Sequence, residues 1–194
     1  MAYGSSKDPY CYPGTSVLLN KAGIADADDL SDYEASYVRT RAEEPWPLGK
    51  LDRAHYYALH RHFFQDVYDW AGKPRTIRIG KGGNWFCFPD FIDSELDRLF
   101  GDLRKKKHLV GLSLDDFARE AAHFIAEVNA IHPFREGNGR TQLAFLRLLC
   151  LNAGWRFDAS VLERERVISA MIASFDGKPD ALTELVRDVA SPKP

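Results

Sequence analysis

The chain has 194 residues, 45% of them hydrophobic, which is enough for one domain with a buried core. The formal net charge is only −2 at pH 7, so no overall positive field would attract a nucleic acid or an anionic membrane. We therefore expect a single domain over residues 1–194, with no direct nucleic-acid partner and no membrane partner. Any phosphate must be bound at a local site, which favours a small phosphorylated ligand over a polynucleotide.

The three cysteines, Cys11, Cys87 and Cys150, are far apart in the sequence and include no CxxC pair. This spacing argues against a disulfide framework and a cysteine-based zinc site, and a reducing compartment fits it best. The N-terminal segment has no apolar signal-peptide core, and no stretch approaches the roughly 18 apolar residues of a membrane span. These features predict a cytoplasmic protein, with secretion into a host cell by another signal left open.

The predicted elements begin with an ordered arm over residues 1–20, which is rich in Tyr, Pro and Gly. Along the chain, apolar residues then recur about every 3.6 positions, the pattern of helices with one buried face. The predicted helices cover residues 15–22, 27–44, 51–70, 90–106, 113–131, 141–154, 160–175 and 179–190. Ser113 is an expected N-cap and Gly154 an expected helix stop. The tryptophans are interpreted as packing residues; they are Trp46, Trp70, Trp85 and Trp155.

One segment departs from the helical pattern. In residues 75–89, RTIRIGKGGNWFCFP, two β-prone runs flank a turn-rich centre from Gly80 to Asn84. Glycines at the centre supply the positive φ angles that a hairpin turn needs. The segment predicts a β-hairpin, the one β element expected, so the predicted fold class is all-α (mainly α) with a single hairpin.

A second departure is the sequence IHPFREGNGRTQ at residues 131–142, between two strongly apolar helices. Gly137, Asn138 and Gly139 permit unusual backbone angles and let a ligand approach the backbone N–H groups. They directly precede a helix, whose unpaired first-turn N–H groups and dipole form an anion site. Arg140 adds a planar cation suited to phosphate oxygens.

Glu136 lies among these anion-binding groups, where a carboxylate would repel phosphate unless a cation bridged the two. Mg²⁺ commonly binds one or two carboxylates plus substrate phosphates, so Glu136 is the candidate metal ligand. His132 titrates near neutral pH and is the candidate general base that accepts a proton from an attacking hydroxyl. Phe134 is expected to anchor the loop in the core.

The sequence HPFREGNGR resembles the active-site motif of the Fic family, H-x-F-x-[D/E]-G-N-G-R-x-x-R. Residues 63–89 resemble the helix end and hairpin flap of that family, and residues 8–24 resemble its N-terminal arm. The resemblance implies a Fic-type helical bundle with the hairpin flap beside an active-site loop at residues 132–143. It also implies transfer of AMP from ATP to a Ser, Thr or Tyr hydroxyl of a target protein.

The resemblance implies roles for the motif residues and for the flap. His132 would be the base, Glu136 would hold Mg²⁺, and Phe134 would be structural; the phosphates would be bound by Gly137, Asn138, Gly139 and Arg140. An exposed hairpin edge could accept a segment of the target as an added strand. The flap residues expected to position the target are Ile79, Lys81 and Phe86. A bacterial topoisomerase subunit is the kind of target that the resemblance suggests.

One position departs from the family motif. The second arginine is replaced by Leu143, and Arg147 lies one turn further along the expected helix. In the family that arginine helps to hold the γ-phosphate, so we expect weaker or altered nucleotide preference. The inhibitory pattern [S/T]-x-x-x-E-[G/N] is also missing, because the only Glu followed by Gly or Asn is Glu136. The resemblance then points to a separate small antitoxin chain or to a host-directed effector.

Four functional interpretations are compatible with these residues. The first is nucleotidyl transfer to a protein by a toxin or effector, and the second is another phosphoryl transfer through the same loop, as in a Doc-like kinase. The third is a non-catalytic phosphate-binding module, and the fourth is a purely structural helical domain. A second metal site is not indicated, because His60 and His62 are two residues apart and face different directions on a helix.

Overall fold

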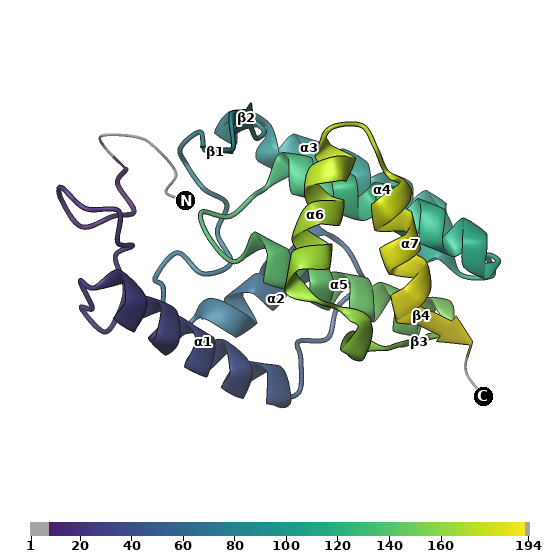
Figure 1. Ribbon diagram of the computed structural model, residues 1–194, viewed down its shortest axis with the longest axis horizontal. Coiled ribbons are helices and arrows are strands. Elements are labelled where there is room, and N and C mark those ends of the chain that lie inside the picture. Colours follow the sequence, from purple (N-terminus) through teal and green to yellow (C-terminus); the bar gives the residue numbers. More distant parts are fainter. Residues whose placement is uncertain (1–7, 193–194) are drawn as a thin grey trace.

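A computed structural model describes residues 8–192 as a mainly helical fold (Figure 1). Within this range the α-helices are α1 Ala27–Glu43, α2 Arg53–Phe64, α3 Ile92–Lys105, α4 Leu114–Ile131, α5 Asn138–Ala153, α6 Arg164–Phe175 and α7 Asp180–Val189. Short 3₁₀ turns lie at Pro89–Phe91, Lys107–Leu109 and Ala159–Val161. The mainly α fold class is thus confirmed.

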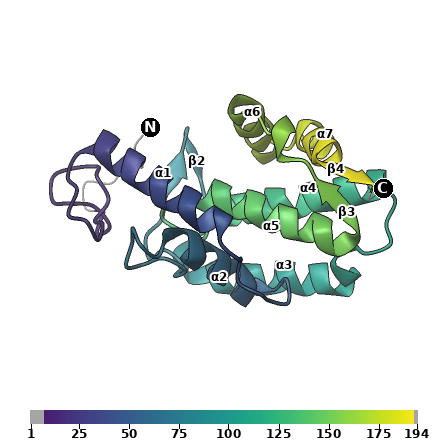
Figure 2. The ribbon, with the colours of Figure 1, turned by 90° about the horizontal axis from the view of Figure 1, so that it is seen from below.

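The helices form layers around the central pair α4 and α5 (Figure 2). Helices α6 and α7 cover one side of this pair, and α2 and α3 lie on the other, with α1 packed against α2. One hydrophobic core joins the layers, and its fully buried aromatic residues are Tyr56, Phe64, Phe117, Phe134 and Phe145. Because α4 and α5 are central, the loop between them begins and ends in helices that pack in the core.

Several predicted helix boundaries are confirmed by their capping groups. The Ser113 hydroxyl accepts a hydrogen bond from the Asp116 N–H at 3.2 Å and starts α4. Gly154 ends α5 with a φ of 94°, the left-handed conformation that glycine tolerates. Lys105 lies in the last turn of α3, where positive charge opposes the helix dipole.

The helix predicted over residues 15–22 is wrong. Tyr12 and Val17 pair through a 2.9 Å N–H to carbonyl bond, and Leu18 forms an antiparallel bridge with Cys11. The apolar residues are therefore buried by extended pairing around the turn at Pro13 and Gly14. Residues 8–20 of the predicted arm are described by the structure, and its residues 1–7 lie outside the described part of the chain.

Two other predicted helices are too long. Helix α2 ends at Phe64, not at residue 70, and a series of turns continues to residue 72. Val67 and Tyr68 are buried in those turns, so their apolar spacing resembles a helix without being one. Helix α6 begins at Arg164, because Asp158 caps a separate 3₁₀ turn in front of it.

The predicted hairpin is present but short. Strand β1 (Gly80–Lys81) pairs antiparallel with β2 (Asn84–Trp85), with Gly80 opposite Trp85. The expectation of a single β element is wrong, since β3 (Trp155–Phe157) also pairs antiparallel with β4 (Ala190–Pro192). Trp85 is not a packing residue: it is 57% exposed, and the Arg78 guanidinium lies 4.7 Å from its ring centre.

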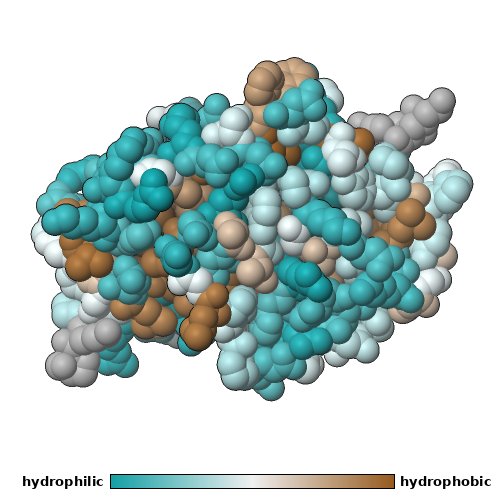
Figure 3. All heavy atoms as spheres, turned by 180° about the vertical axis from the view of Figure 1, so that it is seen from behind, coloured by the Kyte–Doolittle hydropathy of each residue, from teal (hydrophilic) through white to brown (hydrophobic). Residues whose placement is uncertain are grey.

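The surface facing away from the viewer of Figure 1 is mostly hydrophilic, with hydrophobic residues in separate patches (Figure 3). Between residues 8 and 192, none of the helices is both long enough and apolar enough to cross a bilayer. All three cysteines are free thiols, in line with the absence of a CxxC pair.

Candidate active site

The turn between α4 and α5 is built around an unusual backbone conformation at His132. This residue caps α4 with φ 50° and ψ 64°, a left-handed position that glycine normally occupies. The His132 N–H still donates to the Val128 carbonyl at 2.9 Å, and Pro133 then prevents the helix from continuing. A histidine held in this conformation by its surroundings is typical of a functional position.

The His132 ring has a defined hydrogen-bonding state. Its Nδ1 lies 3.2 Å from the Asn129 carbonyl oxygen, which can only accept, so Nδ1 carries the proton and Nε2 is the basic nitrogen. Phe86 from the hairpin stacks on the ring, with the ring centres 3.8 Å apart. Burial, with nearby Arg75 and Lys81, lowers the pKa of His132, which keeps the imidazole neutral and able to accept a proton.

The start of α5 leaves backbone donors open. Gly137 is the N-cap with φ 81° and supplies no capping side chain. Among residues 8–192, the N–H groups of Asn138, Gly139 and Arg140 have no hydrogen-bond partner. Three unpaired N–H groups at the positive end of a helix form an anion site.

The loop before α5 is held by buried polar contacts. The Asn138 amide accepts from the Phe134 N–H at 3.0 Å and donates to the Phe134 carbonyl at 2.8 Å. Both ends of its side-chain amide are thus bonded to Phe134, and its backbone N–H is open to a phosphate. Phe134 is fully buried and stacks on His60, whose ring centre is 3.7 Å away.

His60 also fixes the loop, through hydrogen bonds of both ring nitrogens. Its Nδ1 accepts from the Gly72 N–H at 2.8 Å, so its Nε2 must carry the proton that it donates to the Glu136 carbonyl at 3.0 Å. Burial lowers the pKa of His60 to about 3, so the ring is neutral at pH 7. Sequence reasoning excluded His60 as a metal ligand but did not find this contact.

Arg140 is held between two carboxylates and an aromatic ring. Its Nη1 is 2.7 Å from Glu34 Oε1, and its Nη2 is 3.5 Å from Glu136 Oε1. The guanidinium carbon lies 4.7 Å from the Phe64 ring centre, within cation–π range. Glu34 belongs to α1, about one hundred residues away in sequence, and no local pattern predicts it.

Among the described residues, Glu136 is the only carboxylate that lines the same cavity as His132. Its Oε1 accepts from the Gly137 N–H at 2.9 Å, and its Oε2 has no partner within the described chain. No cluster of three or more His, Cys, Asp or Glu suited to a metal occurs in residues 8–192. One open carboxylate oxygen fits a Mg²⁺ ion that receives its other ligands from nucleotide phosphates and water.

A cavity of about 610 Å³ brings the motif together with the hairpin and α6. Its charged side chains are Lys81, Glu136, Arg140 and Arg164, so cations outnumber carboxylates. Its far wall is apolar, formed by Leu143, Leu162, Val167, Ile168, Met171, Ile172 and Phe175. Arg147 does not line it, and its guanidinium lies 4.8 Å from the Trp46 ring centre. Gln142 lines the cavity and is 1% exposed, with its Nε2 unpaired in the described chain.

The flap residues differ in what they face. Lys81 is exposed and lines the cavity, and Phe86 covers the His132 ring. Ile79 is buried, at 3% exposure, and does not line the cavity, and its carbonyl accepts from the Phe86 N–H across the hairpin at 3.1 Å. Trp85 is exposed at the hairpin tip.

Arg75 connects the flap to the loop and was missed by sequence reasoning. The side chain is 2% exposed, and its guanidinium donates to the carbonyls of His132 (2.8 Å), Ile77 (2.6 Å), Cys87 (2.6 Å) and Ile131 (3.2 Å). The buried guanidinium of Arg75 thus joins the segments before and after the hairpin to the turn at His132. No spacing rule distinguishes Arg75 from Arg78. Arg78 is exposed, and its guanidinium lies over the rings of Trp85 and Phe88.

The N-terminal arm supports the loop from another side. Arg135, 4% exposed, pairs with Asp8 at 2.7 Å. Both side chains are nearly excluded from water, where an ion pair is screened little. The arm is therefore part of the site's scaffold.

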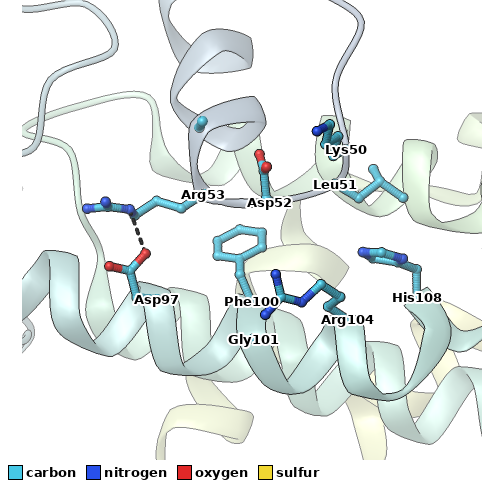
Figure 4. Close-up of a pocket in the computed structure, with 10 residues that line it drawn as sticks. Lys50, Leu51, Asp52, Arg53, Asp97, Phe100, Gly101, Arg104 and His108 are labelled. Carbon is cyan, nitrogen blue, oxygen red and sulfur yellow. Dashed lines mark ion pairs between the residues drawn. The ribbon is translucent and has the colours of Figure 1, made fainter.

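A second cavity, of about 450 Å³, lies between the start of α2 and α3 (Figure 4). Arg53 pairs with Asp97 across it at 2.9 Å, and Asp52 is used as the N-cap of α2. Arg104 and His108 also face this cavity, but none of its lining residues in the described chain has a buried side-chain N or O atom without a partner. The chemistry of the motif is confined to the first cavity.

Comparison with known proteins identifies the same region. The model of the Fic/DOC family matches residues 50–150. The chain is 53% identical over 186 residues to y4lH of Sinorhizobium fredii, a probable protein adenylyltransferase, covering 95% of this chain and 97% of that one. It is 37% identical to the protein adenylyltransferase VbhT of Bartonella schoenbuchensis, covering 95% of this chain and 39% of VbhT.

A solved structure with a bound nucleotide analogue is also similar. The BepC effector protein of Bartonella tribocorum, crystallised with AMPPNP, superimposes with a TM-score of 0.86 at 29% identity, and the match covers 98% of this chain and 100% of that one. Both sequence and fold therefore agree over nearly the whole chain. The protein belongs to the Fic/DOC family.

Proposed function

We propose that the protein is a protein adenylyltransferase that transfers AMP from ATP to a hydroxyl side chain of a target protein. The observation that carries the proposal is that the free Nε2 of His132 shares one cavity with the open N–H groups of α5 and with Arg140. A base and an anion site side by side are what hydroxyl attack on a phosphate requires. The similarity to y4lH, which is named a probable protein adenylyltransferase and is 53% identical, supports the same activity.

The transfer follows from these groups. The target hydroxyl oxygen forms a bond to the α-phosphorus of ATP, while the bond from that phosphorus to the bridging oxygen of pyrophosphate breaks. The hydroxyl proton passes to Nε2 of His132, which is unprotonated because Nδ1 holds the ring's proton against Asn129. The N–H groups of Asn138 and Gly139 and the Arg140 guanidinium stabilise the negative charge on the phosphate oxygens.

Glu136 is the proposed ligand of Mg²⁺. Its open Oε2 faces a cavity in which phosphates would supply further oxygen ligands. A bound Mg²⁺ would neutralise part of the phosphate charge. The Arg140 contact to Glu136 at 3.5 Å is weak enough to yield to a metal.

The target protein would lie along the hairpin. The exposed Lys81 is placed to meet an added strand, Ile79 supports the hairpin from its buried side, and Phe86 stacks on the ring of the base. We propose a Ser, Thr or Tyr acceptor, with a bacterial topoisomerase subunit as the first target to assay. A toxin role in the cytoplasm, with a separate small antitoxin chain as partner, is part of the same proposal.

Labelled ATP tests the reaction. We expect α-³²P from ATP to label a target protein, and we expect His132→Ala to abolish the label because no other side chain replaces Nε2. His123→Ala is the matched control, since His123 is an exposed histidine on α4, the helix that His132 caps. Label from γ-³²P alone would instead identify a Doc-like kinase, and no His132-dependent label would identify a phosphate-binding module.

A further inference from the structure

A carboxylate of α1 touches the phosphate-binding arginine of the motif. Glu34 is 8% exposed, one of only two buried residues of α1, and its Oε1 lies 2.7 Å from Arg140 Nη1 (α1 beside α2 and the start of α5, Figure 2). A buried charge is retained only when it is paired and hydrogen-bonded. The position of Glu34 therefore depends on Arg140, and that of Arg140 on Glu34.

A tyrosine completes the arrangement. The Tyr68 hydroxyl donates to the other oxygen of Glu34, Oε2, at 2.6 Å. Tyr68 is 2% exposed and stacks on Trp70 with ring centres 4.4 Å apart, so its hydroxyl is rigidly placed. Burial and the Glu34 charge raise the pKa of Tyr68, which keeps its proton available for this bond.

The arrangement holds one edge of the guanidinium and leaves donors free. Arginine has five N–H donors in a planar fork, and the Glu34 contact engages Nη1. The Phe64 ring supports the guanidinium carbon at 4.7 Å. Since Arg140 still lines the cavity, its remaining N–H groups are available to phosphate.

We propose that Glu34 and Tyr68 are positioning residues, which orient Arg140 toward the phosphates of the bound nucleotide. The proposal rests on the phosphate-binding role of Arg140 in the proposed function. Without Glu34, the long Arg140 side chain would be free to sample many rotamers, and binding would have to order it. Helix α1 is then a part of the active site, although it lies outside the motif.

If Glu34 instead competed with phosphate for Arg140, its removal would change nucleotide affinity and transfer rate in the opposite direction. A competing carboxylate would weaken nucleotide binding, so its removal would tighten binding and speed transfer. A positioning carboxylate strengthens binding, so its removal weakens binding and slows transfer. Affinity and rate in a Glu34 variant therefore distinguish the two roles.

The experiment uses the full chain and calorimetric titration with Mg²⁺ and α,β-methylene-ATP, whose α–β bond cannot be cleaved. We expect Glu34→Gln to weaken binding by about 10- to 100-fold, the range for residues that orient a ligand-binding group. Tyr68→Phe removes one hydroxyl, keeps the ring stacking, and should weaken binding less. In transfer assays, both variants should raise KM for ATP and lower kcat.

Asp66→Asn is the matched control. Asp66 also fixes α1, through Arg41 at 2.7 Å, but unlike Glu34 it forms no ion pair with Arg140 in the described chain. We expect this variant to lose stability and to keep nucleotide affinity, which separates positioning of Arg140 from general loosening of α1. Equal loss of affinity in Asp66→Asn and Glu34→Gln would overturn the proposal.

Arg140→Ala separates this proposal from the proposed function. If Arg140→Ala leaves affinity unchanged, the phosphate-binding role of Arg140 fails. If it weakens binding but Glu34→Gln does not, or if Glu34→Gln tightens binding, the positioning role alone fails. In the double variant, Glu34→Gln should cause no further loss beyond Arg140→Ala, because its effect acts through the arginine.

Discussion

Gly137 and Gly139 are two residues apart in one motif, but the structure requires glycine at the first position only. An alanine Cβ at Gly137 would lie 2.4 Å from Phe64 Cζ, on a backbone with φ 81°. A Cβ at Gly139 would meet no atom within 4 Å, and its φ is not positive. We predict that Gly137→Ala destabilises the fold and that Gly139→Ala does not.

The magnitudes follow from these contacts. For Gly137→Ala, a left-handed non-glycine residue costs about 1–2 kcal/mol and overpacking against Phe64 adds about 1–3 kcal/mol, so the sum is about 2–5 kcal/mol. For a chain of this length that lowers Tm by about 4–20 °C. Gly139→Ala should change stability by between zero and a gain of about 1 kcal/mol, since alanine favours a helix more than glycine does.

For nucleotide binding, Gly139 should be the sensitive position, although its substitution leaves the fold stable. Gly139 lines the cavity, so a methyl group there would obstruct the phosphate that its N–H is placed to bind. Loss of one hydrogen bond to a charged group, about 1.5–3 kcal/mol, would weaken binding of Mg²⁺ and α,β-methylene-ATP by roughly 10- to 150-fold. Circular dichroism melts and calorimetry measure the two quantities separately. A folded Gly139→Ala variant that binds nucleotide normally would refute a close backbone approach by phosphate.

Three other substitutions test the supports of the site. His60 has a folded pKa of about 3 against about 6.5 unfolded, so its stabilising contribution is present above pH 6.5 and is lost as pH falls toward 3. Lowering pH from 7.5 to 5 should cost about 2 kcal/mol through His60, and urea melts should show a flatter pH profile for His60→Gln. Arg75→Met leaves four carbonyls unpaired and should cost at least about 3 kcal/mol, with faster proteolysis within residues 75–89. Leu143→Arg should increase affinity for ATP over AMP several-fold, about 1 kcal/mol; equal affinity ratios in calorimetry would show that position 143 does not reach the terminal phosphate.

The residues of the loop could be found from the sequence because their chemistry is local. His132, Glu136 and Arg140 are within nine positions, and the helix that follows places them around a single set of N–H groups. The same applies to the helices whose apolar residues face one core, such as α4 and α5. Short-range spacing fixes both the backbone and the side chains in these segments.

Burial by turns is less visible in a sequence. Val67 and Tyr68 continue the apolar spacing of α2 after the helix has ended, and Val17 and Leu18 are buried by extended pairing. Apolar periodicity indicates which residues are buried, but it does not determine whether the buried segment is a helix, a turn or an extended strand. Helix predictions over 15–22 and 65–70 were wrong for this reason.

Supports that come from distant segments leave no local pattern at all. Arg75 and Arg78 are separated by two residues of one β-prone run, but the first bonds four buried carbonyls and the second covers exposed aromatic rings. Only the packing of the hairpin against the α4–α5 turn decides which arginine is buried.

The same reasoning explains why the motif alone does not define a working site. A guanidinium on a flexible side chain binds phosphate well only if its orientation is fixed before binding. Arg140 receives that orientation from Glu34, Tyr68 and Phe64, which belong to α1, to the turn after α2 and to α2 itself. Substitutions in these segments should therefore change nucleotide affinity while every residue of the motif is intact, and a transplanted motif without them should bind phosphate poorly.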